Sequence, residues 1–158
     1  MQITRETDYA IRCILHISEN PQRVTVVDEI ATAKDIPKSF LAKILQKLAK
    51  ANIVISTRGV KGGFRLAVSP VQISLLDIIE AVQGPLLFNI CVLDKKSCNR
   101  SNYCSVHPVW VKLQADLVKK LGSINFKKLI KEESAFFKAN SKQKGGGRLC
   151  IQSGKCQT

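Results

Sequence analysis

Three cysteines and one histidine lie close together in the second half of the chain. Cys91, Cys98, Cys104 and His107 follow the spacing C-x6-C-x5-C-x2-H, and residues 95–102 are polar apart from Cys98. A polar loop gains little from bringing three thiols together unless something binds them. Thiolate and imidazole groups are ligands suited to an iron–sulfur cluster, zinc or copper(I).

The spacing alone leaves three interpretations of this loop open. An iron–sulfur cluster would take the three thiolates and a fourth ligand that is not a thiolate. A zinc site of three cysteines and one histidine is equally allowed, with Cys104 and His107 as a chelating pair. In the third interpretation, the thiols form a redox switch or bind nothing. A weak fourth ligand would favour sensing, because the iron that it holds is the easiest to attack or lose.

Composition places the chain in a reducing compartment. Its 158 residues include six cysteines, and the N-terminus lacks the apolar core of a signal sequence. Cysteines in such a chain are typical of ligand or redox chemistry in the cytoplasm, where disulfides are rare. No run of about 18 apolar residues is present, so we expect no membrane span.

Positive charge is concentrated in one part of the N-terminal half. The net charge is +13, and residues 34–65 hold eight basic residues and one acidic residue. The rest of the first ninety residues holds three basic and seven acidic residues. Such focusing indicates a surface that binds a polyanion.

The basic segment has the pattern of a winged helix-turn-helix. We expect helices over residues 4–19, 25–33 and 37–51, with Thr25 and Asp28 capping the second and Pro37 opening the third. The expected buried stripe of the third helix is Phe40, Leu41, Ile44, Leu45 and Leu48. Strands at 53–56 and 64–68 flank a glycine-rich tip that carries Arg58 and Lys61, which is typical of a wing.

Ser74 and Asp77 predict a capping box that opens a helix through Val82.

The third helix is the candidate reader of DNA. If this helix enters a major groove of DNA, Ser39, Ala42 and Lys43 would face the edges of the bases. Lys38, Lys47 and Arg58 are expected at phosphates or the minor groove, and Lys61 joins Arg58 on the wing. If roughly four cations per subunit touch phosphate, the log–log salt slope of a dimer is about −7.

Two helices follow the cysteine loop. Residues 108–122 form a long helix with Trp110, Leu113, Leu117 and Leu121 on one face, which we interpret as core or dimer seam. The chain therefore divides into a DNA-binding domain (1–84), a cluster-binding loop (85–107), a dimerisation helix with a following helix (108–139), and a flexible basic tail (140–158). Cys150 and Cys156 lie in this tail.

These motifs resemble the iron–sulfur winged-helix regulators of the Rrf type. The resemblance runs from residue 1 to about 139 and is carried by residues 7–12 (TDYAIR), 39–45 (SFLAKIL), 58–66 (RGVKGGFRL) and 104–110 (CSVHPVW). It implies a homodimer joined by the long helix, a palindromic double-stranded DNA operator, and a cluster that modulates affinity for DNA. Cys91, Cys98 and Cys104 carry over as cluster ligands.

The resemblance offers two fourth ligands. His107 stands where members like IscR, which hold a [2Fe-2S] cluster, place a histidine. Asp8 stands where members like NsrR, which hold a [4Fe-4S] cluster, take a carboxylate from the partner subunit. An ion pair between Asp8 and Arg12, one turn on, is the simpler interpretation of that residue. The six-residue first gap and Ala42, where IscR-like members carry glutamate, depart from the IscR pattern.

We therefore expect a mainly α fold with a small β-hairpin, in which a winged helix-turn-helix precedes a long dimerisation helix. The predicted protein is a cytoplasmic, homodimeric transcription regulator and repressor. Its operator affinity would respond to nitric oxide, oxygen or iron–sulfur supply through the cluster. The alternative is a zinc-stapled or cluster-free winged-helix protein whose cysteine loop is structural or redox-active. Nothing in the sequence has the pattern of an enzyme active site.

Overall fold

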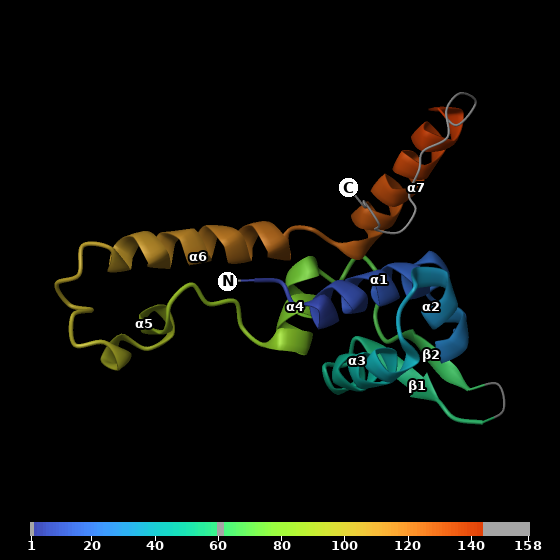
Figure 1. Ribbon diagram of the computed structural model, residues 1–158, viewed down its shortest axis with the longest axis horizontal. Coiled ribbons are helices and arrows are strands. Elements are labelled where there is room, and N and C mark those ends of the chain that lie inside the picture. Colours follow the sequence, from blue (N-terminus) through green and yellow to red (C-terminus); the bar gives the residue numbers. More distant parts are fainter. Residues whose placement is uncertain (1, 60–61, 144–158) are drawn as a thin grey trace, which may run out of the picture.

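A mainly helical body carries one long helical arm. The computed structural model describes residues 2–59 and 62–143. The elements are α1 (Arg5–Glu19), α2 (Val27–Lys34), α3 (Lys38–Lys50), β1 (Val54–Thr57), β2 (Gly63–Leu66), α4 (Leu75–Gln83), α5 (Ile90–Leu93), the short 3-10 helix η1 (Lys95–Ser97), α6 (His107–Gly122) and α7 (Phe126–Gln143). In Figure 1, α6 extends away from the body formed by α1–α4 and the hairpin, and α5 and η1 lie along it. No helix within the described ranges is both long and apolar enough to cross a membrane.

The helix-turn-helix forms where the sequence predicts it. Asp35, in the left-handed conformation with φ 51°, ends α2 and donates its N–H to the carbonyl of Ala31. Pro37 stands just before the first residue of α3, and its carbonyl accepts from the N–H groups of Phe40 and Leu41 at 3.0 and 3.1 Å. The turn thus satisfies backbone groups at the end of one helix and the start of the next.

The predicted cap at Thr25 is wrong. Helix α2 begins at Val27, and its N-cap Val26 makes no side-chain hydrogen bond. Thr25 is instead buried and pairs its backbone with Phe64, with N–O distances of 2.8 and 2.9 Å. This β-bridge fixes the hairpin against the helices and requires glycine at position 63, because a Cβ there would collide with the backbone of Thr25.

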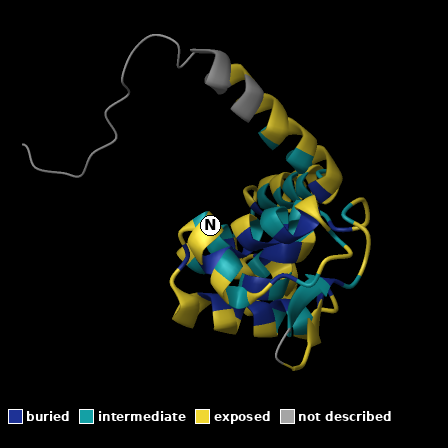
Figure 2. Cartoon of the chain, turned by 90° about the vertical axis from the view of Figure 1, so that its right-hand side faces the viewer, coloured by how far each residue is buried: buried dark blue, intermediate teal, exposed yellow. Residues whose placement is uncertain are grey.

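The core lies between α1 and α3. Its fully buried members include Ala10, Cys13, Ile14, Ile17, Leu41, Ile44, Leu45 and Leu48. Figure 2 shows these buried positions gathered between the helices of the body. Phe40 was expected among them but is 47% exposed. It lies about 100° around the helix from Leu41, off the buried stripe, and its ring instead meets Tyr9 edge-on at 6.1 Å.

The C-terminal half of the body is fixed by a cap and an anchor. The capping box predicted at Ser74 and Asp77 is confirmed, with both reciprocal hydrogen bonds present. Phe126, fully buried at the start of α7, joins that helix to the core, and α7 contacts α1. Helix α7 continues to Gln143, beyond the predicted end at residue 139, because no glycine interrupts the chain before Gly145. The tail cysteines Cys150 and Cys156 lie outside the described residues.

Burial makes Cys13 a poor nucleophile. Loss of hydration raises the pKa of its thiol to about 12, whereas an exposed cysteine has a pKa of about 8.5. In the folded, cluster-free protein at pH 8, we expect iodoacetamide to modify the exposed Cys98 and to spare Cys13. Since the folded-state pKa is the higher one, this thiol stabilises the fold fully below about pH 8.5 and progressively less as the pH rises toward 12.

Peptide mass mapping after timed alkylation measures both cysteines in one sample. Denatured protein provides the control, because Cys13 should then react like the others. Native Cys13 reacting as fast as Cys98 would contradict its placement in the core.

Candidate functional site: the recognition helix and the cysteine loop

The face of α3 opposite its buried stripe is open to solvent. Ser39, Ala42 and Lys43, predicted to face bases, are all exposed there. Gln46 and Lys50 extend the same exposed face by further turns, and sequence reasoning did not select them. The position of Gln46 four residues after Ala42 was the available signal, since a glutamine amide can bond the edge of adenine.

Two of the predicted phosphate contacts, Lys38 and Arg58, are exposed. The ammonium group of Lys38 lies 2.9 Å from Asp28, but both side chains are more than half exposed. Such a pair contributes about 0–1 kcal/mol, so it would open readily toward a phosphate. Arg58 is exposed at the hairpin tip. Lys61, predicted beside it, lies outside the described residues.

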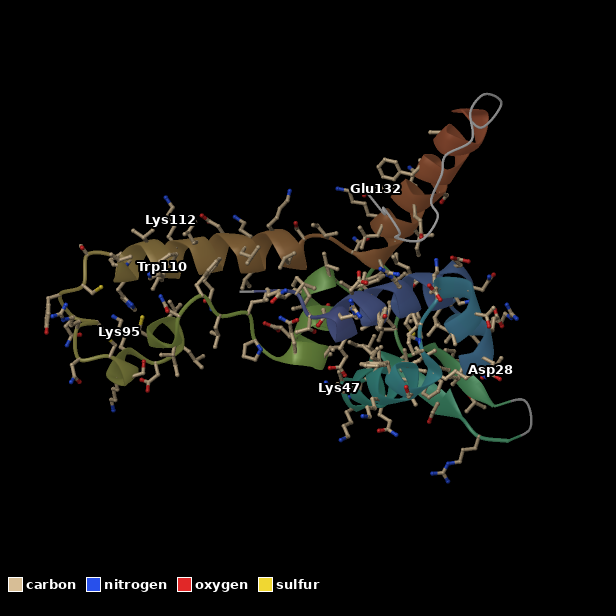
Figure 3. The ribbon with its side chains drawn as sticks, viewed as in Figure 1. Asp28, Lys47, Lys95, Trp110, Lys112 and Glu132 are labelled. Atoms are coloured by element: carbon tan, nitrogen blue, oxygen red, sulfur yellow. The ribbon has the colours of Figure 1, made fainter. Side chains whose placement is uncertain are left out.

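Lys47 differs from the other cations of α3. Its Nζ atom donates to Glu6 Oε2 and to the carbonyl of Val82, both at 2.9 Å. Figure 3 shows Lys47 where α3 approaches α4, at the other end of the helix-turn-helix from Asp28. The structure therefore engages this lysine within the body rather than leaving it free on the reading face.

The cysteine loop is more open than the body. Cys91 in α5 and Cys104 are half-buried, and Cys98, just after η1, is exposed. No group of three or more histidine, cysteine, aspartate or glutamate side chains within residues 2–59 and 62–143 is arranged to hold a metal ion. The predicted ligands share one loop, but the described conformation does not gather them.

His107 differs from the three cysteines of this loop. As the first residue of α6 it is only 6% exposed, and neither Nδ1 nor Nε2 has a hydrogen-bond partner. A buried polar atom without a partner costs about 1–3 kcal/mol and is uncommon in folded proteins. A soft, buried and unpaired donor beside Cys104 fits the chemistry of a metal or cluster ligand.

Asp8, the other candidate for fourth ligand, is already paired. Its carboxylate lies 2.7 Å from Arg12, one turn further along α1, and both side chains are 47% exposed. The Arg12 guanidinium also lies 5.8 Å from the centre of the Tyr9 ring. The ion pair expected as the simpler interpretation of Asp8 is thus present.

An aromatic stack anchors the base of the loop on α6. Phe88 stacks on Trp110 with ring centres 6.0 Å apart, and its backbone N–H donates to Gln114 Oε1 at 3.3 Å. In Figure 3, Trp110 lies on the side of α6 that faces the loop. Val109 and Leu113 on the same helix are exposed apolar residues. Of the predicted seam, Leu117 and Leu121 are half-buried.

Known proteins share both the sequence pattern and the fold. The sequence profile of a family described as "Rrf2: Iron-dependent Transcriptional regulator" matches residues 3–132. A relative from Aquifex aeolicus (strain VF5), whose name describes an HTH-type transcriptional regulator, is 35% identical over 111 residues, which span 69% of this chain and 77% of the relative.

Two solved structures share the fold. IscR of T. potens superimposes with a TM-score of 0.67 at 22% identity, covering 84% of this chain and 88% of that chain. CymR (YrzC), titled the global cysteine regulator of B. subtilis, gives 0.68 at 21% identity, covering 84% and 98%. At these identities the likeness concerns the fold alone.

The exposed wing arginine should act through charge rather than through base recognition. Replacing Arg58 with alanine removes one cation from each subunit, so we expect weaker binding to all duplex sequences alike. The log–log salt slope should become shallower by about 2 for a dimer. Fluorescence anisotropy with labelled duplexes over a range of salt concentrations measures both quantities.

Lys131→Ala is the matched control, because Lys131 is an exposed cation on α7, away from the wing. It should leave the slope unchanged. An unchanged slope for Arg58→Ala would remove this residue from the DNA-binding surface.

Proposed function

Because the chain belongs to the Rrf2 family of transcriptional regulators, we propose that it is a homodimeric repressor whose operator affinity depends on an iron–sulfur cluster. Cys91, Cys98, Cys104 and His107 would hold this cluster. The observation that carries the proposal is the buried imidazole of His107, whose two nitrogen atoms have no partner in the described structure. The neighbouring thiols are free and accessible enough to complete a donor set.

The same observation favours His107 over Asp8 as the fourth ligand. His107 is buried and unpaired, whereas Asp8 is half-exposed and paired with Arg12. By the family resemblance, a histidine in this place accompanies a [2Fe-2S] cluster, and a partner's carboxylate accompanies a [4Fe-4S] cluster. We therefore propose the [2Fe-2S] form and keep ligation by Asp8 as the alternative.

The chain's own residues would convert ligation into a change of shape. When bound, the cluster would supply a centre sensitive to nitric oxide, oxygen and iron supply. Cys104 and His107 flank the start of α6, and α6 contacts α4 in the body. Holding Cys91 and Cys98 against this point would draw the open loop onto α6, next to the stack of Phe88 on Trp110.

Dimerisation through α6 would hold the recognition helices of the two subunits at a fixed spacing. The exposed apolar side chains Val109 and Leu113, four residues apart, give this helix a surface that a second copy can bury. A two-fold dimer presents its two recognition helices to a palindromic operator. A change in the loop at the start of α6 would then alter the spacing or tilt of the two recognition helices. We propose that the protein acts in the cytoplasm.

A cluster-free or zinc-stapled regulator is the second candidate. It is favoured by the open arrangement of the loop, in which Cys98 is exposed and the predicted ligands are not gathered. Three thiolates and one imidazole also form an accepted zinc site. Metal analysis separates the two candidates.

We expect protein purified without oxygen to contain iron and acid-labile sulfide, with visible absorption bands. Cys91→Ser, Cys98→Ser, Cys104→Ser and His107→Ala should each lose or alter these bands, while Asp8→Asn should keep them. With an operator duplex selected from a random pool, cluster-loaded and cluster-free protein should differ in Kd by about tenfold, within the 5–150-fold usual for allosteric coupling.

Three results would count against the proposal. Colourless protein with one zinc per chain would select the second candidate. Loss of the bands in Asp8→Asn, with retention in His107→Ala, would assign the fourth ligand to Asp8. Equal Kd values with and without the cluster would remove the sensing function.

A further inference from the structure

Three elements of the body meet at Lys47 on the recognition helix. Its ammonium group lies 2.9 Å from the carboxylate of Glu6, at the start of α1, and 2.9 Å from the carbonyl of Val82, near the end of α4. Lys47 is 40% exposed and Glu6 is 30% exposed, so solvent screens this ion pair only in part. The lysine therefore bridges two other helices while standing on the helix that is proposed to read DNA.

The contact with Val82 lies at the C-terminal end of α4, where a positive charge is most favourable. The last carbonyls of a helix lack partners within it and form the negative end of its dipole. Lys47 satisfies one of these carbonyls from a different helix. Gly84 satisfies another by donating its N–H to the carbonyl of Glu80. At the end of α4, one carbonyl thus accepts a hydrogen bond from the following residue of the chain, and another accepts one from a lysine on the recognition helix.

The next residue of α4 ties the same point to the N-terminus. Gln83 Oε1 accepts from the hydroxyl of Thr7 at 2.7 Å and from the backbone N–H of Thr4 at 3.2 Å. Thr7 is fully buried and Gln83 is half-buried, so this hydrogen bond is only partly open to water. The predicted ligand loop begins at residue 85, only two residues after Gln83.

We propose that Lys47 is a positioning residue that transmits the state of the cysteine loop to the recognition helix. We call Lys47, Glu6, Val82 and Gln83 the polar latch. A displacement of the loop acts first on the end of α4, and the latch carries it to α3 and to the start of α1. This inference rests on the proposed function, because it presumes that the loop has two states.

The placement of Lys47 on its helix supports this role over a phosphate contact. Lys47 follows Phe40 by seven residues, so the two side chains lie on the same side of α3. Phe40 meets Tyr9 of α1, and Lys47 meets Glu6 of α1. Lys43 and Lys50, one turn before and one turn after Lys47, lie about 40° and 60° further around the helix and are exposed. Lys47 thus belongs to the side of α3 that holds the body together.

Two substitutions separate the latch from a phosphate contact. Lys47→Met keeps the aliphatic stem but removes the charge, and Glu6→Gln removes the partner without removing any cation. We expect each to reduce the ratio of Kd values between cluster-loaded and cluster-free dimers at least fivefold, toward one. The salt slope of DNA binding should stay at the wild-type value in both. Lys47→Arg, which can still bond the carboxylate and the carbonyl, should restore most of the ratio.

Lys50→Met is the matched control, since it removes an exposed cation from the same helix. It should make the salt slope shallower or leave it unchanged, and in either case the ratio should stay at the wild-type value. If Lys47→Met does not fold, the ratio of Kd values measured for Glu6→Gln tests the proposal by itself.

The proposal is overturned if Glu6→Gln keeps the wild-type ratio. It is also overturned if Lys47→Met weakens both forms equally while the salt slope falls by about 2 per dimer, as a lost phosphate contact would require. A wild-type ratio of one overturns both the proposed function and this inference, whereas a wild-type ratio above one that both variants keep overturns this inference alone.

Discussion

The apolar face of α1 is the surface on which the rest of the body is assembled. Ile14 and Ile17 are fully buried, and α1 contacts α2, α3, α4, α7 and the hairpin. Deleting a buried side chain of this size costs about 2–5 kcal/mol, a large share of the about 5–15 kcal/mol that stabilises a typical domain. Because the core fixes α3 so firmly, the proposed regulation would act from the edge of the body rather than by loosening its core.

The edge available for regulation is the path from α4 to α6. Its loop has polar residues and an exposed Cys98, and its hydrogen bonds join residues close in sequence, whereas its two ends are anchored to other elements. Leu86 is buried on one side, and the Phe88–Trp110 stack holds the other against α6. A segment that is loose in the middle and fixed at both ends can respond to a ligand without unfolding its surroundings. His107 lies at this junction, with a buried imidazole that the protein chain itself does not satisfy.

Local signals in the sequence predicted the elements well, and contacts between distant residues account for the errors. The capping box at Ser74 depends on neighbours three residues apart, so the sequence alone sufficed. The cap expected at Thr25 failed because a β-bridge to Phe64 competes for that segment. Phe40 was assigned to the core by residue type, although its angular position placed it against Tyr9. The family itself followed from four short motifs.

The candidate site was predicted in part for the same reason. The types and spacing of Cys91, Cys98, Cys104 and His107 indicated soft-ligand chemistry, but nothing in the spacing revealed that His107 alone would be buried. The contacts of Lys47 could not be predicted, because Glu6 and Val82 are 41 and 35 residues away. A lysine on a basic helix suggests a phosphate contact by its pattern, and only the packing of α3 on α1 and α4 brings these two partners to it.

In the proposed function, the unpaired imidazole of His107 binds iron. Pulsed electron paramagnetic resonance on reduced, anaerobically prepared protein detects a histidine nitrogen bound to a paramagnetic cluster directly. The account predicts a strong nitrogen coupling in the wild-type protein that disappears in His107→Ala. A cluster-loaded wild-type protein without that coupling, or one whose coupling survives the substitution, would contradict it.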